Sequence, residues 1–460
     1  MGSPLASQVA SWVSRVTFED LPDDVVAATK LRILDVIGLA LAGADTPFGR
    51  STRAAAVAMS PEGPSRILGT GERVGVTTAA FANAALAQAL EFDDTHNESV
   101  VHMSSPSVAS TLALSETRRI SGRELILAIA IANEISCRVG SVSSGQFHRR
   151  GFHPTGLFAP FGVTYAIGKI LGLDEPALAY AAGTCGSFAA GLLECWVDGT
   201  DTKFLHSGWA AQSGMTAALL AQAGVTGPPK VFEGRFGLFA SHMQDPDAPK
   251  VLDRIVDRLG TYWESRHSSF KPFPAAHVLH PYISALLRLR ERHRIAAADV
   301  ASIECPVAEF NVSIVCEPVE EKCAPATQAH CRVCLQYTLA EALCRGELGR
   351  NAYIDRYRLD PDVLALARRV TYHVDPAFPG PGRFKGVVRV TLNDGRSFSE
   401  TEEYNRGSAE NPMTDVELGA KFDDNASGFL SASERARLTD QIARAEQLTD
   451  AGTLVTLSIP

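Results

Sequence analysis

Residues 79–96 of the chain read AAFANAALAQALEFDDTH, and His102 follows a few positions later. The apolar run 79–90 predicts a helix buried on all sides. Directly after it come carboxylates, a hydroxyl and two imidazoles: Glu91, Asp93, Asp94, Thr95, His96 and His102. Charges at the end of a buried helix are costly unless they are paired, hydrated or used in function. This stretch is therefore the first candidate for a functional site.

Helical spacing extends on both sides of this stretch. Ser121 and Glu124 have the spacing of a capping box at the start of a helix. Several predicted helices are rich in Ala and Gly, which allows close helix packing, and no fixed-period repeat suggests a solenoid. The predicted helices before residue 260 are 8–17, 25–42, 52–59, 77–90, 106–117, 122–139, 156–171, 175–193, 207–223 and 230–239.

The pattern changes near residue 260. Strands are predicted at 301–307, 369–374, 386–392 and 397–402, and helices at 277–290 and 326–345. Asn393-Asp394-Gly395 between two of the strands is a strong hairpin signal. Helices return at 415–422 and 433–448. We therefore expect a mainly α protein, with an all-helical domain built from both chain ends (1–268 and 409–460) and an inserted α+β lid domain (269–408).

The totals exclude some classes of protein. The chain has 460 residues and a net charge of −9, which disfavours a nucleic-acid binder. No signal peptide and no membrane-spanning run are expected, so a cytoplasmic location is predicted. The nine cysteines are interpreted as buried thiols. Cys331 and Cys334, with Cys323 and His330 nearby, could imitate a zinc site, but a lone C-x-x-C pair is weak evidence.

Three further polar clusters resemble the first: 151–156, 201–208 and 268–281. All four lie at predicted helix starts or in the loops before them, where free backbone N–H groups form anion sites. Lys203 and Lys271, with His102 and His153, would suit a substrate with several carboxylates. Asp93 or Asp94 could orient a histidine for proton transfer, and Tyr337 is a further candidate acid.

Simpler interpretations exist for each cluster. A histidine before proline is often a structural cap, a lysine at a helix start is usually solvated, and Thr95 could be an N-cap. Asp93, Asp94, His96 and His102 could also bind a divalent ion in a metal hydrolase. The two histidines lie six positions apart, however, so no helix would present them together, and no metal is expected.

Seven segments form a pattern that covers nearly the whole chain. They are 34–43 (LDVIGLALAG), 91–96 (EFDDTH), 151–153 (GFH), 203–211 (KFLHSGWAA), 270–274 (FKPFP), 322–325 (KCAP) and 336–337 (QY). Each segment is weak alone, but in their order and spacing they together resemble the MmgE/PrpD family. The family includes 2-methylcitrate dehydratases, cis-aconitate decarboxylases and iminodisuccinate epimerases.

The resemblance implies a homodimer, a site between the two domains, and no metal or organic cofactor. Carried over by motif, the catalytic residues are Asp93, His102, His153 and Tyr337. The implied substrate-binding residues are Thr95, Lys203, Lys271 and Glu91. Asp94, His206 and His277, from the same polar clusters, are further candidates for substrate binding. Glu91 departs from the family pattern, which often has Asp there, and the interval from Thr95 to His102 is about one residue longer than in the decarboxylases.

The chemistry implied is proton transfer at a carbon next to a carboxylate. Lysines would hold the carboxylates and stabilise the negative charge of the intermediate, and a histidine would move the proton. We expect a cofactor-independent lyase acting on a small di- or tricarboxylic acid, with dehydration favoured over decarboxylation or epimerisation. The alternative from another class is a helical scaffold that has lost activity.

Overall fold

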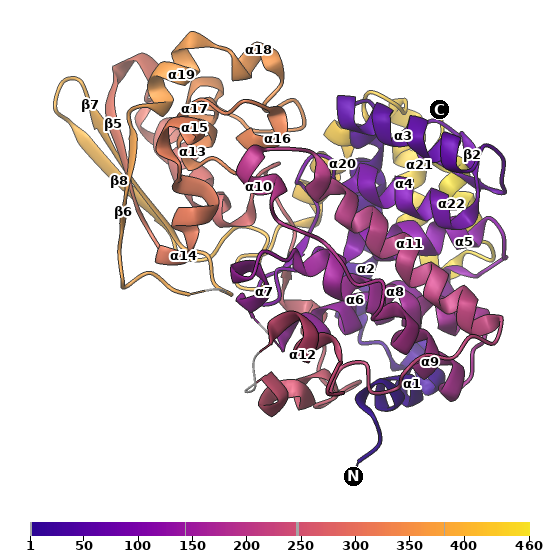
Figure 1. Ribbon diagram of the computed structural model, residues 1–460. Coiled ribbons are helices and arrows are strands. Elements are labelled where there is room, and N and C mark those ends of the chain that lie inside the picture. Colours follow the sequence, from indigo (N-terminus) through magenta and orange to yellow (C-terminus); the bar gives the residue numbers. More distant parts are fainter. Residues whose placement is uncertain (1, 143, 245–247, 381) are drawn as a thin grey trace.

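The computed structural model describes residues 2–142, 144–244, 248–380 and 382–460. A larger helical part and a smaller part built around a sheet lie side by side (Figure 1). The mainly α fold expected from the sequence is confirmed. The longer helices of the larger part are α1 (Leu5–Arg15), α2 (Asp23–Ala44), α3 (Pro47–Met59), α4 (Val76–Gln88), α5 (Ser104–Ser115), α6 (Gly122–Ser141), α8 (Pro154–Leu171), α9 (Glu175–Cys185), α11 (Thr202–Gln222), α20 (Asp415–Ala426) and α21 (Ala432–Ala443).

Short elements complete the larger part. Strand β3 (Thr95–His96) pairs antiparallel with β4 (Ser268–Ser269), which places Thr95 opposite Ser269. This pairing brings the segment after α4 beside the segment that leads to Lys271. The short elements are α7 (Gln146–Arg149), α10 (Cys195–Asp198), α12 (Leu238–Met243), α22 (Gly452–Leu457), β1 (Ser65–Arg66), β2 (Arg73–Val74), β3 (Thr95–His96) and β4 (Ser268–Ser269).

Most predicted helices are present within a few residues of their expected ends, and the capping box at Ser121 is confirmed. Three predictions were wrong in extent. The helix expected at 230–239 is mostly turns, because Gly234 and Gly237 interrupt it, and only α12 follows. The helix expected at 175–193 ends at Cys185. The helix expected at 326–345 divides into α16 (Gln328–Cys331) and α17 (Leu335–Arg345), because Cys334 adopts an extended backbone conformation.

The central helices pack closely because glycines face neighbouring backbones. A Cβ atom at Gly43 of α2 would lie 2.0 Å from the carbonyl oxygen of Leu86 in α4. A Cβ atom at Gly162 of α8 would lie 2.1 Å from the carbonyl oxygen of Ala132 in α6. Both distances are far below van der Waals contact, so only glycine allows these helix approaches.

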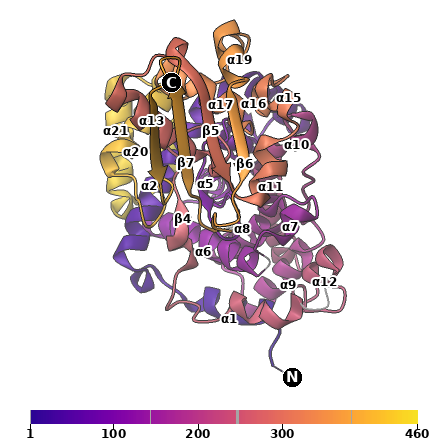
Figure 2. The ribbon, with the colours of Figure 1, turned by 90° about the vertical axis from the view of Figure 1, so that its left-hand side faces the viewer.

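The smaller part contains a four-stranded sheet in the order β6–β5–β7–β8. Strands β5 and β6 are parallel, and the other neighbours are antiparallel. The predicted hairpin is confirmed, with β7 and β8 at the expected residues. In Figure 2 the sheet faces the viewer, and helices of the same part lie behind it. The elements are β5 (Val300–Val307), β6 (Val370–Val374), β7 (Gly386–Leu392), β8 (Ser397–Glu402), α13 (His280–His293), α14 (Glu309–Asn311), α15 (Val319–Cys323), α18 (Asp355–Arg358) and α19 (Pro361–Ala367).

Buried apolar side chains form two separate clusters. One joins residues 5–263 with residues 422–455, and the other lies within residues 275–392. The C-terminal helices α20 and α21 accordingly pack against α2, as Figure 1 shows for the yellow and indigo segments. The domain boundaries at 268/269 and 408/409 stay a prediction.

Helix α2 fixes the segment that follows α4. The guanidinium of Arg32 donates to the Asp94 carboxylate at 3.2 Å. One turn further, Asp35 pairs at 2.8 Å with Lys421 of α20, and Lys421 also donates to the carbonyl oxygen of Phe92 at 2.8 Å. Burial raises the pKa of Asp35 to about 6, although Lys421 opposes this shift. Helices α2 and α20, which are distant in sequence, therefore fix the position of residues 92–94.

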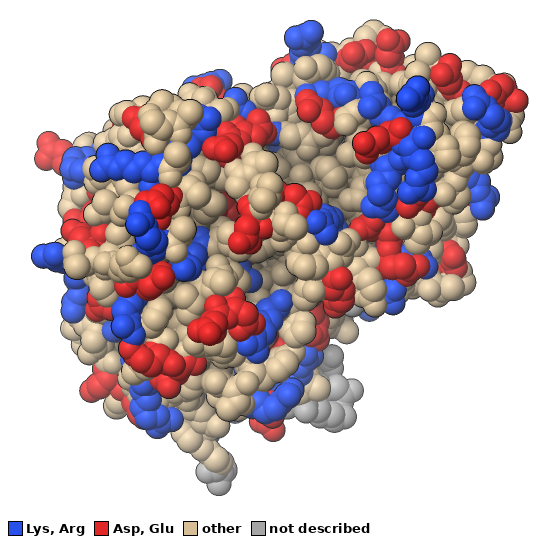
Figure 3. Space-filling model, turned by 180° about the vertical axis from the view of Figure 1, so that it is seen from behind, with Lys and Arg blue, Asp and Glu red and all other residues tan. Residues whose placement is uncertain are grey.

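The surface shows interspersed charge. Lys and Arg side chains alternate with Asp and Glu on the face seen in Figure 3. That face offers no extended basic area of the kind that binds nucleic acid. Within the described residues, no helix is both long and apolar enough to cross a membrane.

Replacing Lys421 by Met should lower the free energy of unfolding by about 3 kcal/mol, because it leaves the buried Asp35 without its counter-charge. Urea denaturation measures this change. The matched control is Lys30→Met. Lys30 also pairs with a carboxylate, that of Glu446 at 3.1 Å, and also donates to a carbonyl, but its side chain is 20% exposed. Its loss should cost less than about 1 kcal/mol. Equal losses in the two variants would contradict a supporting role for Lys421.

Candidate active site

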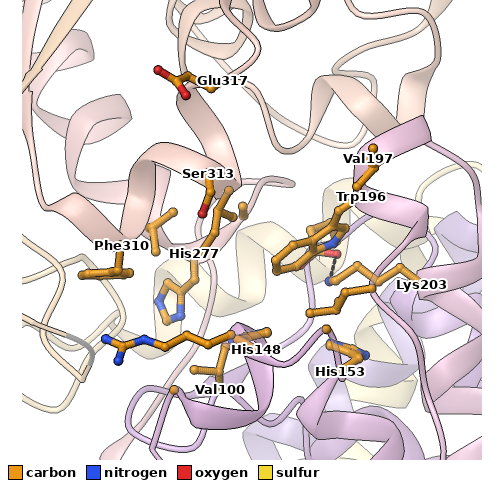
Figure 4. Close-up of a pocket in the computed structure, with 18 of the residues that line it drawn as sticks. Val100, His148, His153, Trp196, Val197, Lys203, His277, Phe310, Ser313 and Glu317 are labelled. Atoms are coloured by element: carbon orange, nitrogen blue, oxygen red, sulfur yellow. Dashed lines mark hydrogen bonds and ion pairs between the residues drawn. The ribbon is translucent and has the colours of Figure 1, made fainter.

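A cavity of about 930 Å³ is lined by residues of both parts of the chain. Seven residues proposed from the sequence line it: Glu91, Thr95, His102, His153, Lys203, Lys271 and His277. Figure 4 shows Trp196, Lys203 and His153 toward one side of this cavity and Phe310, Ser313 and Glu317 of the smaller part toward another. Clusters that are up to 186 positions apart in sequence thus meet in one cavity.

The Glu91 carboxylate lies at the centre of the buried charges. Lys271 donates to it at 3.0 Å and to the Glu91 carbonyl oxygen at 3.1 Å, and Lys203 pairs with the other carboxylate oxygen. Burial opposes ionisation, but the two ammonium groups outweigh it and hold the pKa of Glu91 well below its usual value. Burial lowers the pKa of Lys271, and Glu91 partly offsets that shift. Lys203 and Lys271 therefore both bind the same carboxylate of the chain itself, that of Glu91.

The backbone of Glu91 is unusual. Its φ is 53°, in the left-handed region that residues other than glycine rarely adopt. Such a conformation costs about 1 kcal/mol or more. It lies at the point where the chain leaves α4, and the ion pairs with Lys203 and Lys271 compensate the strain.

His102 lies against Asp93 and Thr95. Its Nδ1 is 3.1 Å from Asp93 Oδ1 and 3.3 Å from Thr95 Oγ1, and its Nε2 is 3.7 Å from Glu91 Oε1. Asp93 is fully buried, does not line the cavity, and accepts a hydrogen bond from Ser105 at 2.8 Å. Burial raises the pKa of Asp93, but His102 and Lys271 together outweigh burial and the net shift is downward. Asp93 therefore orients His102 and does not meet the cavity.

His153 is the second imidazole of the cavity wall. It precedes α8, and its ring centroid is 5.7 Å from that of His102. Its Nδ1 lies 3.0 Å from Nδ1 of His206, which does not line the cavity. Burial and then the nearby Lys203 lower the pKa of His153 well below its ordinary value. His153 is thus neutral near pH 7 and available as a base.

Asp94 and His96 face away from this arrangement. Asp94 accepts hydrogen bonds from Arg32 and from the Ser104 hydroxyl, the latter at 2.6 Å. His96 Nδ1 is 2.8 Å from Ser99 Oγ. Neither residue lines the cavity, so Asp94 is not placed to bind substrate. The four residues considered for a metal hydrolase do not converge, and within the described residues no group of three or more His, Cys, Asp or Glu could hold a metal ion.

Tyr337 does not reach the cavity. It is fully buried in the apolar cluster of the smaller part, and its hydroxyl has no hydrogen-bond partner among the described residues. Burial raises the pKa of Tyr337, which makes the phenol a weaker acid. A catalytic role for Tyr337 stays a prediction that this position does not support. His277, by contrast, lines the cavity, and its Nε2 accepts from the Asn405 amide at 2.8 Å.

Three cavity residues were missed as site residues. His148 lines the cavity 5.3 Å from the ring of Trp196, and Lys203 Nζ lies 5.9 Å from that ring. Lys322 also lines the cavity and is buried, and it donates to the carbonyl oxygens of Ile314 at 3.0 Å and Val333 at 2.9 Å. The signal for Lys322 was the segment KCAP. His148 lies three residues before the GFH motif, and nothing local marked Trp196.

The buried charges of the cavity wall are mostly positive. Four glutamates of the lining are exposed: Glu194, Glu309, Glu317 and Glu321. The buried charged side chains of the lining are one carboxylate, Glu91, and three ammonium groups, on Lys203, Lys271 and Lys322. The interior of the cavity therefore attracts anions, because buried charges are screened less than exposed ones.

The fold and the site define a mainly helical protein with a cavity of buried lysines and histidines between two apolar cores. Family models support one assignment. The model of the MmgE/PrpD N-terminal domain matches residues 7–250, and that of the MmgE/PrpD C-terminal domain matches residues 273–447. The chain belongs to the MmgE/PrpD family.

Relatives with named activities cover most of the chain. Cis-aconitate decarboxylase of Aspergillus terreus is 27% identical over 99% of this chain and 96% of its own length. The human cis-aconitate decarboxylase is 28% identical over 95% of this chain and 91% of its own. The 2-methylcitrate dehydratase of Cupriavidus necator is 24% identical over 73% of this chain and 72% of its own. Decarboxylases and dehydratases of this kind are lyases.

The buried histidines predict that acid destabilises the protein. Burial lowers the pKa of His96, His148 and His280 to about 3 and that of His206 to about 4. The unfolded chain would bind these protons below pH 6.5, so the stabilisation is complete above that pH and is lost as pH falls toward 3. Each histidine should cost about 2 kcal/mol at pH 5. Asp35, with its raised pKa, shifts in the opposite sense and offsets part of this loss.

Urea denaturation at pH 7.5 and pH 5.0 measures the effect. The variant His280→Asn tests one histidine outside the cavity, whose Nε2 lies 3.0 Å from the Ala275 carbonyl oxygen. Its free energy of unfolding should fall about 2 kcal/mol less between the two pH values than that of the wild type. An identical pH dependence in both proteins would show that His280 is not neutral by burial.

Proposed function

We propose that the protein is a lyase that acts on a small di- or tricarboxylic acid. The observation that carries this proposal is the excess of buried lysine over buried carboxylate in the cavity wall, next to two imidazoles. Lys203 and Lys271 can bind a substrate carboxylate in the way they hold that of Glu91. Lys322, in the smaller part, adds a further buried positive charge. A ligand with two or three carboxylates would balance these charges.

The histidines would move the proton. The Nδ1 atom of His102 lies against the Asp93 carboxylate, an arrangement that holds the ring of a general base in place. His153 is neutral and lies across from it, with 5.7 Å between the ring centroids. The lysines would stabilise the negative charge that develops on the substrate carboxylate when the neighbouring carbon gains or loses a proton.

Two reactions fit this geometry. Decarboxylation releases CO2 and then needs one proton donor at carbon, and it is favoured by relatives named for it that cover nearly the whole chain. Dehydration, the reaction expected from the sequence, needs a base for the C–H bond and an acid for the departing hydroxyl. His102 and His153 can supply this base and this acid. Dehydration is therefore the second candidate reaction.

We also propose that the chain is a homodimer, which rests on its membership of the family. Sedimentation equilibrium tests this proposal, since a dimer has twice the 49.2 kDa of one chain. A single species of monomer mass at micromolar concentration would contradict it.

The lysines are tested by turnover. Lys203→Met and Lys271→Met should each lower kcat/KM for the acid that is turned over by about 10²-fold or more, because each removes a charged hydrogen-bond donor for a carboxylate. The panel of test substrates consists of cis-aconitate, citrate and 2-methylcitrate. Turnover is measured from the release of CO2 and from the ultraviolet absorbance of the double bond. The control is Lys169→Met, whose ammonium donates to Ser14 O, outside the cavity lining.

A double variant separates substrate binding from ion pairing. Lys203→Met leaves Glu91 with less counter-charge, and adding Glu91→Gln removes that imbalance. If Lys203 holds substrate, the double variant recovers stability while turnover stays low. Recovery of turnover in the double variant would show that Lys203 only neutralises Glu91.

A scaffold without activity makes a different prediction. A binding site stabilises the folded state by RT ln(1 + [L]/Kd), so the active-site proposal expects a rise in melting temperature with polycarboxylates. The wild type should show this shift with at least one acid of the panel, and Lys271→Met should not. No shift and no turnover with any acid would favour the scaffold.

A further inference from the structure

His206 lies behind a cavity histidine and not in the cavity. It is on α11, one turn after Lys203, and is 6% exposed. The sequence makes it a candidate for substrate binding, but His206 is not part of the cavity lining. Its close polar neighbour is His153, with 3.0 Å between the two Nδ1 atoms and 5.0 Å between ring centroids.

A contact of 3.0 Å between two imidazole nitrogens requires that one carries a proton and the other a lone pair. Burial lowers the pKa of both rings, with Lys203 contributing, so both are neutral near pH 7. A neutral imidazole has one N–H group. Two arrangements follow: either His153 donates through Nδ1 and its Nε2 is bare, or His206 donates and His153 carries its proton on Nε2.

The surroundings hold both rings in place. Gly191 O accepts from the His153 backbone N–H at 2.9 Å, and the Cα of Gly191 lies so close to the His206 ring that an added Cβ would be 3.5 Å from it. The φ of Gly191 is 145°, which favours glycine there. On the other side of His153, Nε2 is 3.4 Å from Thr155 Oγ1.

Thr155 also touches the first imidazole of the site. Its Oγ1 accepts from the backbone N–H of His102 at 3.0 Å. That leaves its own proton free for His153 Nε2 when Nε2 is bare. The His153 ring therefore has His206 as the partner of Nδ1 and Thr155 as the partner of Nε2. Whether His206 accepts or donates a proton at Nδ1 determines which nitrogen of His153 is the base.

We propose that His206 is a positioning residue that sets the tautomer of His153 and takes its Nδ1 proton when His153 Nε2 receives a proton from the substrate. For dehydration, the substrate C–H bond breaks as an Nε2–H bond forms on His153. The C–H electron pair becomes the new C=C bond as the hydroxyl departs with a proton from His102. The Nδ1–H bond of His153 breaks as an Nδ1–H bond forms on His206. His206 then releases its Nε2 proton to solvent or returns the Nδ1 proton for the reverse transfer. The inference rests on the proposed proton transfer at a substrate carbon.

The transfer suits the charges around the pair. Burial, and then Lys203, lowers the pKa of both rings and disfavours a lasting imidazolium on either. Passing the second proton to His206 keeps His153 neutral throughout. His206 is the more exposed ring, 6% against 1%, so it is the better placed to exchange a proton with water.

A purely structural role would give different results. In that case His206 would only pack α11 against the start of α8, and any side chain of similar size would serve. His206→Phe tests packing, and His206→Asn keeps a polar group near the position of Nδ1 but cannot pass a proton. His373→Asn, on β6 with a side chain 53% exposed, controls for the loss of a histidine.

The first experiment is nitrogen NMR of histidine-labelled free protein, which needs no substrate. Peaks are assigned with His153→Asn and His206→Asn. His153 should carry its proton on Nδ1 and His206 on Nε2, and His206→Asn should change the tautomer of His153. A proton on Nε2 of His153 in the free wild type would leave that nitrogen unable to accept the substrate proton and would overturn the proposal.

The second experiment is turnover of the acid that the wild type accepts. For both His206 variants kcat should fall about 10²-fold with KM little changed, and the pH profile of kcat should shift, while His373→Asn matches the wild type. Wild-type kcat and pH profile in His206→Asn would overturn the relay. If the wild type turns over no acid of the panel, the proposed function fails, and the NMR result still decides whether His206 sets the tautomer of His153.

Discussion

The buried carboxylate of Glu91 constrains the whole site. An ionised carboxylate without water needs counter-charge, and here Lys203 and Lys271 supply it from α11 and from the segment after β4. Each lysine is equally buried and needs Glu91 in return. Three separate segments are therefore held at one point, and the cavity forms where they meet. Burial, with a contribution from Lys203, lowers the pKa of the neighbouring His153 and His206.

The two parts of the molecule contribute different features to the cavity. The helical part holds the reactive groups from behind, through Arg32 on Asp94 and through Lys421 on the Phe92 carbonyl. Lys421 comes from the C-terminal segment, so the chain must return after the sheet to complete this support. The smaller part contributes the facing wall, with Lys322 and Phe310.

Much of the architecture could be predicted because its causes are local. The hairpin β7–β8 was located to the residue, since Asn-Asp-Gly and alternating burial both act over a few positions. The cap at Ser121 is equally local. Helix extents failed where glycines or an extended residue interrupted an apolar run, as after Cys185 and at Cys334. The polar clusters were also recognisable, because charges beside buried helices are unusual.

Only the tertiary structure decided what each cluster member does. Asp93 and Asp94 are neighbours, yet one meets His102 and the other Arg32. His206 lies behind His153, and Tyr337 lies in an apolar core. Side-chain direction depends on backbone angles and on partners more than fifty positions away, and neither can be read from residue type and spacing. Local sequence therefore defined the elements and the chemical groups, and long-range packing assigned those groups to the cavity, to a supporting position or to the core.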